Sequence, residues 1–410
     1  MIFTEVLPRS LAALLGALLI VIFGLLYGVF SYEEIFTAIS MKMLIFIMGL
    51  FIVVEILDDV GLFRFIGFSL INLTSDPRGY MILFPMMTLF FAAIIDNIPA
   101  MLIAGSLIMA VCKELKIDPA DYIIAAAIFT NIGGITLLIS SIPNILVGFA
   151  FDIGFMEFAN IAIPLALILA AVTLILFSTY LLPKKRSVVH VTMRYDPWSA
   201  VKDKRVFNLS VIIFVAMITL LIFQEKLGVG MEFITFGASI ALLVLTRESI
   251  NEIFKRVDWP TLLFLAGFLI IVSGLDRVGL FKLVATKLTS ICADDASLTA
   301  AFIGLSGIAS GFVDNIPITA ALIPVARSII DQGRFSSAPL LWSLIFGANL
   351  GGNLTPIGSP SNIIALGILE KGGYRGLFKK FLKIGGLTAS LHLLLAAIYT
   401  FSRFIFKIWP

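Results

Sequence analysis

The residues best suited to chemistry in this chain belong to a tetrapeptide that occurs twice. Asp-Asn-Ile-Pro begins at Asp96 and recurs at Asp314, and we call the separation of these two positions the repeat offset. Proline suits the first turn of a helix, and the Asp or Asn before it can cap that helix's free N–H groups. Each tetrapeptide is therefore expected to end one helix and begin another. The candidate binding residues in this region are Asp96, Asn97, Asp314, Asn315 and Thr319.

A second polar segment follows each tetrapeptide, and its two copies are separated by the same repeat offset. Paired glycines, prolines and short polar side chains are poor helix interior, and unwound backbone frees carbonyl groups to coordinate a cation. We therefore expect a broken membrane span in both copies, the second more polar than the first. The candidate residues are Asn131, Gly133, Gly134, Thr136, Ser141 and Asn144 in the first copy, and Asn349, Gly352, Asn353, Thr355, Ser359, Ser361 and Asn362 in the second. Candidate sodium ligands are Asn97, Asn131, Asn315 and Asn349.

Simpler structural explanations exist for each motif. The tetrapeptides can be capped turns at the membrane surface, the aspartates mere helix caps, and the glycines positions where helices pack closely. Repetition of both motifs together favours a functional site, because matching helix breaks in two halves of a membrane protein point to the binding site of a transporter. Glu55 and His392 also lie in apolar runs and are secondary candidates for a proton relay.

Composition indicates a membrane protein. Of the 410 residues, 60% are apolar and 13% are charged, and the mean hydropathy is +1.08. Soluble domains carry about 25% charged residues. Several apolar runs reach the roughly 17 to 25 residues that a helix needs to cross a bilayer. The fold class predicted is therefore an all-α polytopic membrane protein.

Apolar runs and charged breaks divide the chain into two related halves. We expect a first transmembrane repeat at 1–182, a cytoplasmic linker at 183–206, a connecting helix at 207–230 and a second repeat at 231–410. The expected spans are 10–30, 41–57, a broken span at 121–150, 157–182, 207–226, 231–246, 260–275, a broken span at 339–370, and 383–406. Amphipathic residues at 60–73 and paired runs at 80–95 with 97–112, and 298–313 with 315–330, complete the pattern.

The unmatched connecting helix determines the relative orientation of the halves. If each paired run is a re-entrant hairpin, about nine full spans and two hairpins result, and the second repeat starts on the opposite face of the membrane. The repeats are then inverted. Basic residues in the linker place it and the N-terminus in the cytoplasm of a plasma-membrane protein. The loop at 31–40, which contains Glu33 and Glu34, is then external.

Several functional classes are disfavoured. The net charge is +3 and no basic tract carries interleaved aromatic residues, so no nucleic-acid partner is expected. Cys112 and Cys292, the only cysteines, indicate neither a disulfide framework nor a metal site. The sequence contains no Gly-Lys dipeptide and hence no Walker A loop, and it lacks the common hydrolase motifs. We expect a non-enzymatic protein without a cofactor, with Na⁺ or H⁺ as the coupling ion.

The second-half motifs resemble a known group of transporters. The run from Asp314 to Pro324 and the run from Gly351 to Asn362 are similar to those of the ion transporter superfamily. Within it the chain resembles the branch of arsenite-efflux pumps, sodium/proton antiporters and the pigmentation P protein. The resemblance covers nearly the whole chain and implies inverted repeats, re-entrant hairpins and alternating access.

The resemblance also bears on substrate and partners. Carboxylate-transporting relatives carry Ser-Asn-Thr at the hairpin tip, where this chain has Asp-Asn-Ile. An Asp at a helix N-terminus competes with anions, which favours cation or proton exchange, or an uncharged species such as arsenous acid. The expected function is secondary active transport of a small inorganic ion or oxyanion, with arsenite efflux favoured by the resemblance. Alternatives are sodium/proton antiport, sodium-coupled anion or carboxylate uptake, and an ion channel. The expected partners are the lipid bilayer and a small inorganic ion, with a homodimer and a soluble ATPase as further candidates.

Overall fold

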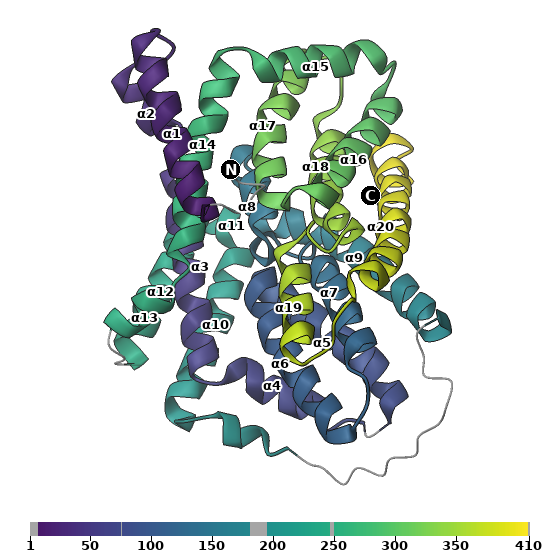
Figure 1. Cartoon of the computed structure of the whole chain (residues 1–410). Helices are drawn as coiled ribbons and strands as arrows, with labels where there is room; N and C mark the ends of the chain where they lie inside the picture. Colours follow the sequence, from purple (N-terminus) through teal and green to yellow (C-terminus); the bar gives the residue numbers. More distant parts are fainter. Residues whose placement is uncertain (1–6, 75, 181–194, 247–249, 409–410) are drawn as a thin grey trace.

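The chain forms a bundle of helices in two related sets. The structure, a computed structural model, describes residues 7–74, 76–180, 195–246 and 250–408, and these contain no strand (Figure 1). The predicted all-α class is therefore confirmed. The first set is α1 (Arg9–Leu26), α2 (Tyr32–Thr37), α3 (Met41–Asp59), α4 (Leu62–Ile71), α5 (Pro77–Ile94), α6 (Asn97–Leu115), α7 (Ala120–Gly133), η1 (Leu138–Ser140), α8 (Ile142–Ala150) and α9 (Phe155–Tyr180).

The remaining helices begin at Pro197. Three of them, η2 (Pro197–Ala200), α10 (Lys204–Ile222) and α11 (Gln224–Leu227), connect the two sets. The second set is α12 (Met231–Thr246), α13 (Ile250–Arg256), α14 (Trp259–Arg277), α15 (Leu280–Ile291), α16 (Asp295–Phe312), α17 (Asn315–Asp331), α18 (Ser337–Gly351), η3 (Gly352–Leu354), α19 (Pro360–Lys371), α20 (Phe378–Thr400) and η4 (Phe401–Ile405).

The repeat offset extends from the motifs to the helix boundaries. Shifted by this offset, both ends of α3 coincide with those of α14, and both ends of α5 coincide with those of α16. The same holds for a shorter helix: the first residue of α4, shifted by the repeat offset, is the first residue of α15. Their N-cap glycines, Gly61 and Gly279, share a left-handed backbone with φ of 88° and 80°. The two sets are thus built from the same succession of elements.

Nine helical segments of the described residues are long and apolar enough to cross a membrane. Six of these segments coincide with expected full spans, whereas α5, α6 and α16 belong to the expected hairpins. The hairpin helices have 18 or 19 residues and are about 27 Å long at 1.5 Å per residue, close to the roughly 30 Å of the hydrocarbon layer. Length alone therefore does not distinguish a re-entrant hairpin from two full spans, and the hairpins stay a prediction.

Equivalent elements of the two sets lie at opposite ends of the molecule. In Figure 1, α4, α5 and α6 occupy the lower half, and their counterparts α15, α16 and α17 occupy the upper half. The tetrapeptides join α5 to α6 and α16 to α17, toward the middle of the molecule. The broken segments after α7 and α18 lie in the same central region.

Glycines allow the helix pairs α5 with α7 and α16 with α18 to pack closely. A Cβ atom on Gly133 would lie 2.5 Å from the carbonyl oxygen of Leu89, and one on Gly351 would lie 2.1 Å from that of Gly307. Leu89 and Gly307 are themselves equivalent positions under the repeat offset, so the same close approach occurs in both sets. Each broken segment is thereby held against the first helix of its hairpin.

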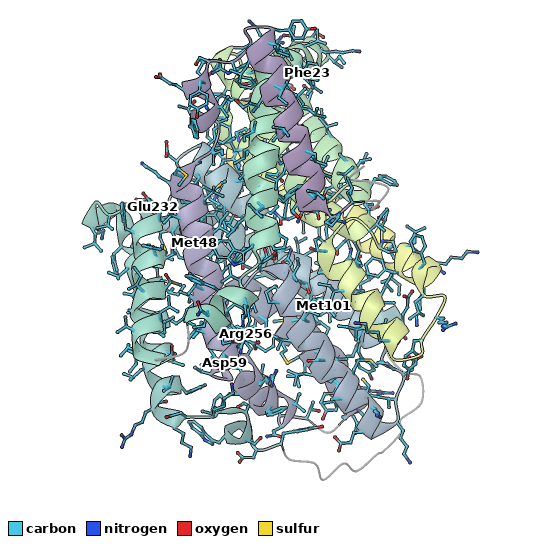
Figure 2. The ribbon with its side chains drawn as sticks, turned by 60° about the vertical axis from the view of Figure 1, so that its left-hand side comes forward. Phe23, Met48, Asp59, Met101, Glu232 and Arg256 are labelled. Carbon is cyan, nitrogen blue, oxygen red and sulfur yellow. The ribbon has the colours of Figure 1, made fainter. Side chains whose placement is uncertain are left out.

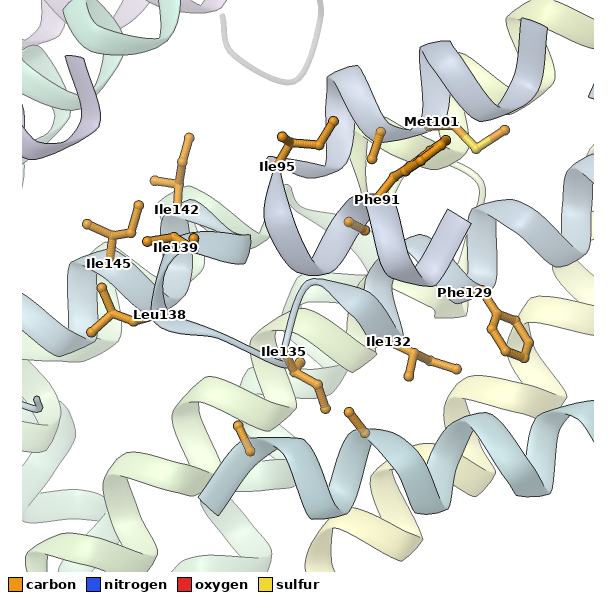
Figure 3. Packing of buried hydrophobic residues seen from close by; sticks show 14 of the residues in the cluster. Phe91, Ile95, Met101, Phe129, Ile132, Ile135, Leu138, Ile139, Ile142 and Ile145 are labelled. Carbon is orange, nitrogen blue, oxygen red and sulfur yellow. The ribbon is translucent and has the colours of Figure 1, made fainter. Parts of the chain in front are cut away.

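Large apolar side chains surround the first broken segment. Ile132, Ile135, Leu138 and Ile142 are buried there, together with Phe91 from α5 (Figure 3). The polar groups of the break are consequently enclosed by hydrocarbon, where an unpaired donor or acceptor is costly. Their hydrogen bonds must therefore come from within the protein.

Two segments between the expected spans contain helical residues. The expected loop at 31–40 contains a helix, α2, because Ser31 and Glu34 form a reciprocal capping box at its start. The described part of the expected linker at 183–206 contains η2 and the first residues of α10. Residues 181–194 lie outside the described residues, whereas η2 and the first turn of α10 follow Asp196 and Asp203, which cap them.

Candidate functional site

The two tetrapeptides form equivalent helix caps. Asp96 accepts a hydrogen bond from the backbone N–H of Ile98 at 3.3 Å, and Asp314 accepts one from that of Ile316 at 3.1 Å. The capping expected from the sequence is therefore present in both copies. We refer to residues 96–99 as the first tip and to residues 314–317 as the second tip.

The tips differ in how their carboxylates are compensated. Arg9, at the start of α1, lies with its Nη1 atom 2.6 Å from Oδ2 of Asp314. Among the described residues Asp96 forms no ion pair. The position equivalent to Arg9 in the second set is Leu227, which cannot carry a charge. The two tips thus have the same sequence but differ in whether a counter-ion pairs with the carboxylate.

Asn144 and Asn362 hold the two breaks open in the same way. Nδ2 of Asn144 donates to the carbonyl oxygens of Gly134 and Leu137, both at 2.8 Å. Nδ2 of Asn362 donates to those of Gly352 at 2.9 Å and Thr355 at 3.1 Å. Each asparagine replaces helix hydrogen bonds that the break removes, which explains why an amide is repeated at this position.

Two serines connect the halves, because each donates a hydrogen bond to an asparagine of the other half. Oγ of Ser141 donates to Oδ1 of Asn349 at 2.9 Å, and Oγ of Ser359 donates to Oδ1 of Asn131 at 3.0 Å. Ser141 and Ser359 are equivalent positions, as are Asn131 and Asn349. All four side chains are buried. The broken segments therefore cross at the centre of the molecule.

Asn353 destroys the symmetry of this crossing. Asn349 donates to Oδ1 of Asn144 at 2.9 Å, but the equivalent Asn131 donates to Oδ1 of Asn353 at 2.7 Å. Asn353 stands where the first copy has Ile135. As a result, Oδ1 of Asn362 is buried without a hydrogen-bond partner among the described residues. The unequal contribution of the copies thus has a structural counterpart.

Asn97 connects the first tip to the crossing. Its Nδ2 lies 3.4 Å from Oδ1 of Asn131, and a Cβ atom on Gly134 would lie 2.8 Å from its Oδ1. That oxygen is buried and has no partner in the part of the chain that the structure describes. Gly134 is therefore needed for this approach, and an acceptor oxygen is left available at the first tip.

Other predicted site residues make local contacts. Thr136 donates to the carbonyl of Gly133 and Thr319 to that of Asn315, both at 2.7 Å. Thr355 donates to the carbonyl of Gly311 at 2.5 Å, which ties the second break to α16. The hydroxyls of Ser361 and Ser359 lie 2.9 Å apart, and Gly352 lies at the second break, close to Gly358.

Two cavities adjoin the tips. The first has a volume of about 250 Å³ and is lined by the first tip, Ser141, Asn315 and residues of α3. The second, of about 600 Å³, is lined by Asp314, Ile316 and Pro317 of the second tip, by Arg9 and by residues of α14. Ile98 and Ile316, the third residues of the two tips, line both cavities. They contribute to the wall that separates the cavities.

The first cavity contains charged residues that the sequence argument did not select. Arg256 and Asp258, which precede α14, line it together with Glu55. Nη1 of Arg256 lies 2.8 Å from Asp59, a pairing visible in Figure 2 at the lower end of α3. In the sequence Arg256 belongs to a charged stretch at 247–258, and no local pattern signals which face of the protein its side chain approaches.

His392 lies away from both cavities. It is buried on α20, with Nε2 2.7 Å from Oγ1 of Thr173 on α9. Glu55, the other secondary candidate, does line the first cavity. Of these two candidates, therefore, Glu55 alone is placed where it can meet a solute in the first cavity.

Among the described residues, the site combines a carboxylate without an ion pair, unpaired amide oxygens and a small cavity beside the first tip. A family model described as a citrate transporter matches residues 1–276 and 229–409. The chain belongs to this CitMHS family. It is therefore a multi-pass membrane transporter, and the expected transport class is confirmed.

Individual relatives agree with this assignment. An uncharacterized transporter of Mycobacterium bovis is 27% identical over 404 residues, with 97% of this chain and 94% of that protein covered. The P protein of Mus musculus is 26% identical over 471 residues, covering 94% of this chain and 56% of that protein. The predicted similarity to the P protein is confirmed, whereas likeness to arsenite pumps and sodium/proton antiporters stays a prediction.

One solved structure supports the fold of this family member. The YdaH transporter of Alcanivorax borkumensis, described as having an unusual topology, superposes with a TM-score of 0.64. The alignment covers 98% of this chain and 99% of that chain at 13% sequence identity. At this identity the likeness concerns the fold alone.

Proposed function

We propose that this protein is a secondary active transporter of a small inorganic ion or oxyanion, coupled to H⁺ or Na⁺ by alternating access. The observation that carries the proposal is the first tip, where Asp96 lines a cavity without forming an ion pair among the described residues. An ionisable group at membrane depth is energetically costly, and such groups usually mark an ion or proton pathway. Asp96 is accordingly the proposed coupling residue.

The charges of the first cavity favour particular substrates. Glu55, Asp96 and Asp258 line it against Arg256, which is already engaged with Asp59. A free, multiply charged carboxylate would meet net negative charge there. A cation, or a small neutral species such as arsenous acid, would not be repelled. This balance supports a small inorganic substrate, and the resemblance to arsenite pumps favours arsenite efflux.

Amide oxygens offer a place for a coupling cation. Carbonyl and amide oxygens are suitable ligands for hard cations. We propose Na⁺ coordination by Asn97, Asn131, Asn315 and Asn349, with the unpaired Oδ1 of Asn97 as its most available ligand. Oδ1 of Asn131 already accepts hydrogen bonds from Asn97 and Ser359, so it would have to exchange them for the ion.

Inverted repeats supply the proposed alternating access. The coincident helix boundaries and the placement of α4 and α15 at opposite ends of Figure 1 support an inverted second repeat with re-entrant hairpins. In such an arrangement the second tip and break can reproduce the positions of the first from the other side of the membrane. We place the protein in the plasma membrane with its N-terminus and the 183–206 linker in the cytoplasm. A homodimer and a soluble ATPase bound near the linker are further proposals.

Citrate uptake is a second candidate. The family description names citrate, and the cavity lies between hydroxyl and amide groups that can bind carboxylates. This candidate requires a cation to offset the acidic lining. Citrate flux that requires Na⁺ or protons would favour it over inorganic ion transport.

Reconstituted protein in liposomes distinguishes these functions. Arsenite and citrate fluxes are measured under imposed proton or sodium gradients, and proton movement is measured under a sodium gradient alone. We expect Asp96→Asn to abolish coupled flux while the protein stays folded, because Asn is also a good N-cap. Asp314→Asn is the matched variant at the second tip. Undiminished coupled flux in Asp96→Asn would assign this residue to capping and would refute the proposed coupling role.

A further inference from the structure

The two repeats differ in charge at their tips, because Arg9 forms an ion pair with Asp314 at the second tip. Arg9 belongs to α1, which packs against α14, whereas Asp314 belongs to the second tip, 305 residues away in sequence. The Arg9 side chain is 39% exposed and that of Asp314 is 12% exposed. Both line the second cavity. The pair therefore bridges two separate structural elements across the wall of a cavity.

We propose that the Arg9 guanidinium is a permanent counter-cation at the second tip, so that a mobile coupling cation is bound at the first tip only. This inference rests on the proposed coupled transport. Arginine remains protonated in proteins, so it cannot release its charge during a transport cycle as Na⁺ or H⁺ can. The repeat would then carry two equivalent carboxylates but only one exchangeable site.

The surroundings of the two carboxylates support this division. Among the described residues that line the second cavity, the charged ones are Arg9 and Asp314, whose charges balance. The first cavity contains Glu55, Asp96 and Asp258 with Arg256, so its acidic groups need added cations or protons to balance their charge. The second tip meets its counter-ion in the protein itself, whereas the first tip has to obtain one from solution.

The geometry also explains why the counter-cation is an arginine at the start of α1. Its guanidinium is a charged donor, and the 2.6 Å contact with a carboxylate is typical of a strong charge-assisted hydrogen bond. The carboxylate keeps its other oxygen for the N–H of Ile316. Capping and charge compensation at the second tip are therefore satisfied together.

The rival explanation is that Arg9 only anchors α1 to the second tip. Both explanations predict a loss of stability when Arg9 is replaced. They differ in the cation dependence, since freeing the Asp314 carboxylate creates a second exchangeable site only if Arg9 was its substitute cation. Arg9→Gln, Arg9→Lys and the double variant Arg9→Gln with Asp314→Asn separate the two explanations.

The experiment uses the full chain and needs no known substrate. Thermal unfolding in detergent is followed as Na⁺ replaces choline at fixed ionic strength, and again as the pH is varied. Coupled flux in liposomes is measured over the same series. Arg277→Gln is the control, because Arg277 pairs with Glu34 at 2.9 Å and neither residue lines these two cavities.

We expect the thermal stability of the wild type, Arg9→Lys and Arg277→Gln to rise with the logarithm of the cation concentration at a slope that corresponds to about one bound cation. In Arg9→Gln this slope should be steeper and should rise toward about two bound cations. The double variant should return to the wild-type steepness, because the second carboxylate is gone. An unchanged steepness in Arg9→Gln would overturn the inference while leaving coupled transport intact.

Two further outcomes are informative. If the wild type responds to neither Na⁺ nor pH, the proposed coupled transport itself fails. If Arg9→Gln does not fold, the double variant decides. Wild-type steepness supports the inference, whereas a shallower response would show that Asp314 binds a mobile cation despite Arg9 and would refute it.

Discussion

At the scale of single residues, equivalent positions of the two repeats have the same chemistry but different partners. The amide nitrogen of Asn144 donates to two carbonyl groups, and its amide oxygen accepts a hydrogen bond from Asn349. Asn362 makes the equivalent two donor bonds, but its oxygen is left unpaired among the described residues because Asn353 takes the amide of Asn131. One copy of the break is thus fully satisfied and the other keeps an available oxygen.

This difference predicts unequal costs of substitution. Asn144→Ala removes four hydrogen bonds, one of them a long contact with Ser140, whereas Asn362→Ala removes two and also eliminates an unpaired oxygen. Each buried group left unsatisfied costs about 1–3 kcal/mol, so Asn144→Ala should be the less stable variant by about that amount. Thermal or denaturant unfolding of the two variants side by side measures the difference. Equal losses would show that water or an ion already pairs the Asn362 oxygen.

At the scale of elements, the segment after the undescribed linker residues docks onto the first repeat. The rings of Phe65 and Trp198 are 4.8 Å apart, and Nζ of Lys202 lies 3.0 Å from Asp59. A Cβ atom on Gly61 would lie 2.1 Å from the carbonyl oxygen of Ala200. No described segment docks at the equivalent Gly279, where a Cβ atom would have none of the described residues within 4 Å.

Gly61 and Gly279 consequently form a matched pair for testing this docking. Alanine at either position adopts an unfavourable left-handed backbone, at a cost of roughly 1–2 kcal/mol. Only Gly61→Ala also clashes with the docked segment. We expect trypsin to cleave Gly61→Ala after Lys202 or Arg205 several-fold faster than Gly279→Ala. Equal cleavage rates in the two variants would mean that the segment docks independently of Gly61.

At the scale of the whole molecule, repeated boundaries and opposite placement support an inverted second repeat. Leu73 and Ile291 are equivalent positions, just after α4 and at the end of α15, with side chains 72% and 75% exposed. In an inverted arrangement they face opposite sides of the membrane. The proposed cytoplasmic linker is followed by a segment that docks beside α4, so the proposed orientation predicts that Leu73 faces the cytoplasm.

Thiol labelling tests this arrangement directly. Leu73→Cys and Ile291→Cys are made separately in a background with Cys112→Ala and Cys292→Ala, the two buried native cysteines. A membrane-impermeant reagent added to intact cells should label Ile291→Cys and should label Leu73→Cys only after lysis. Labelling of both from the same side would refute inverted repeats, and labelling with the sides reversed would refute the proposed orientation.

The sequence determined the features that depend on local pattern and repetition. Apolar runs, the repeat offset and the capping chemistry of Asp96 and Asp314 predicted most of the helices, the breaks and the polar residues that lie at them. These features are local because a helix start or a break is decided by a few neighbouring residues. The short helices α2 and η2 were not predicted, although the capping residues Ser31 and Asp196 stand at their starts.

Only the tertiary structure decided which polar groups meet. The contact of Arg9 with Asp314, the exchange of Ser141 and Ser359 between halves, and the pairing of Arg256 with Asp59 join residues far apart in sequence. Such partners are selected by the packing of helices in three dimensions, and neither periodicity nor residue type records that packing. The repeat therefore predicted two equivalent tips, and the fold made them electrostatically different.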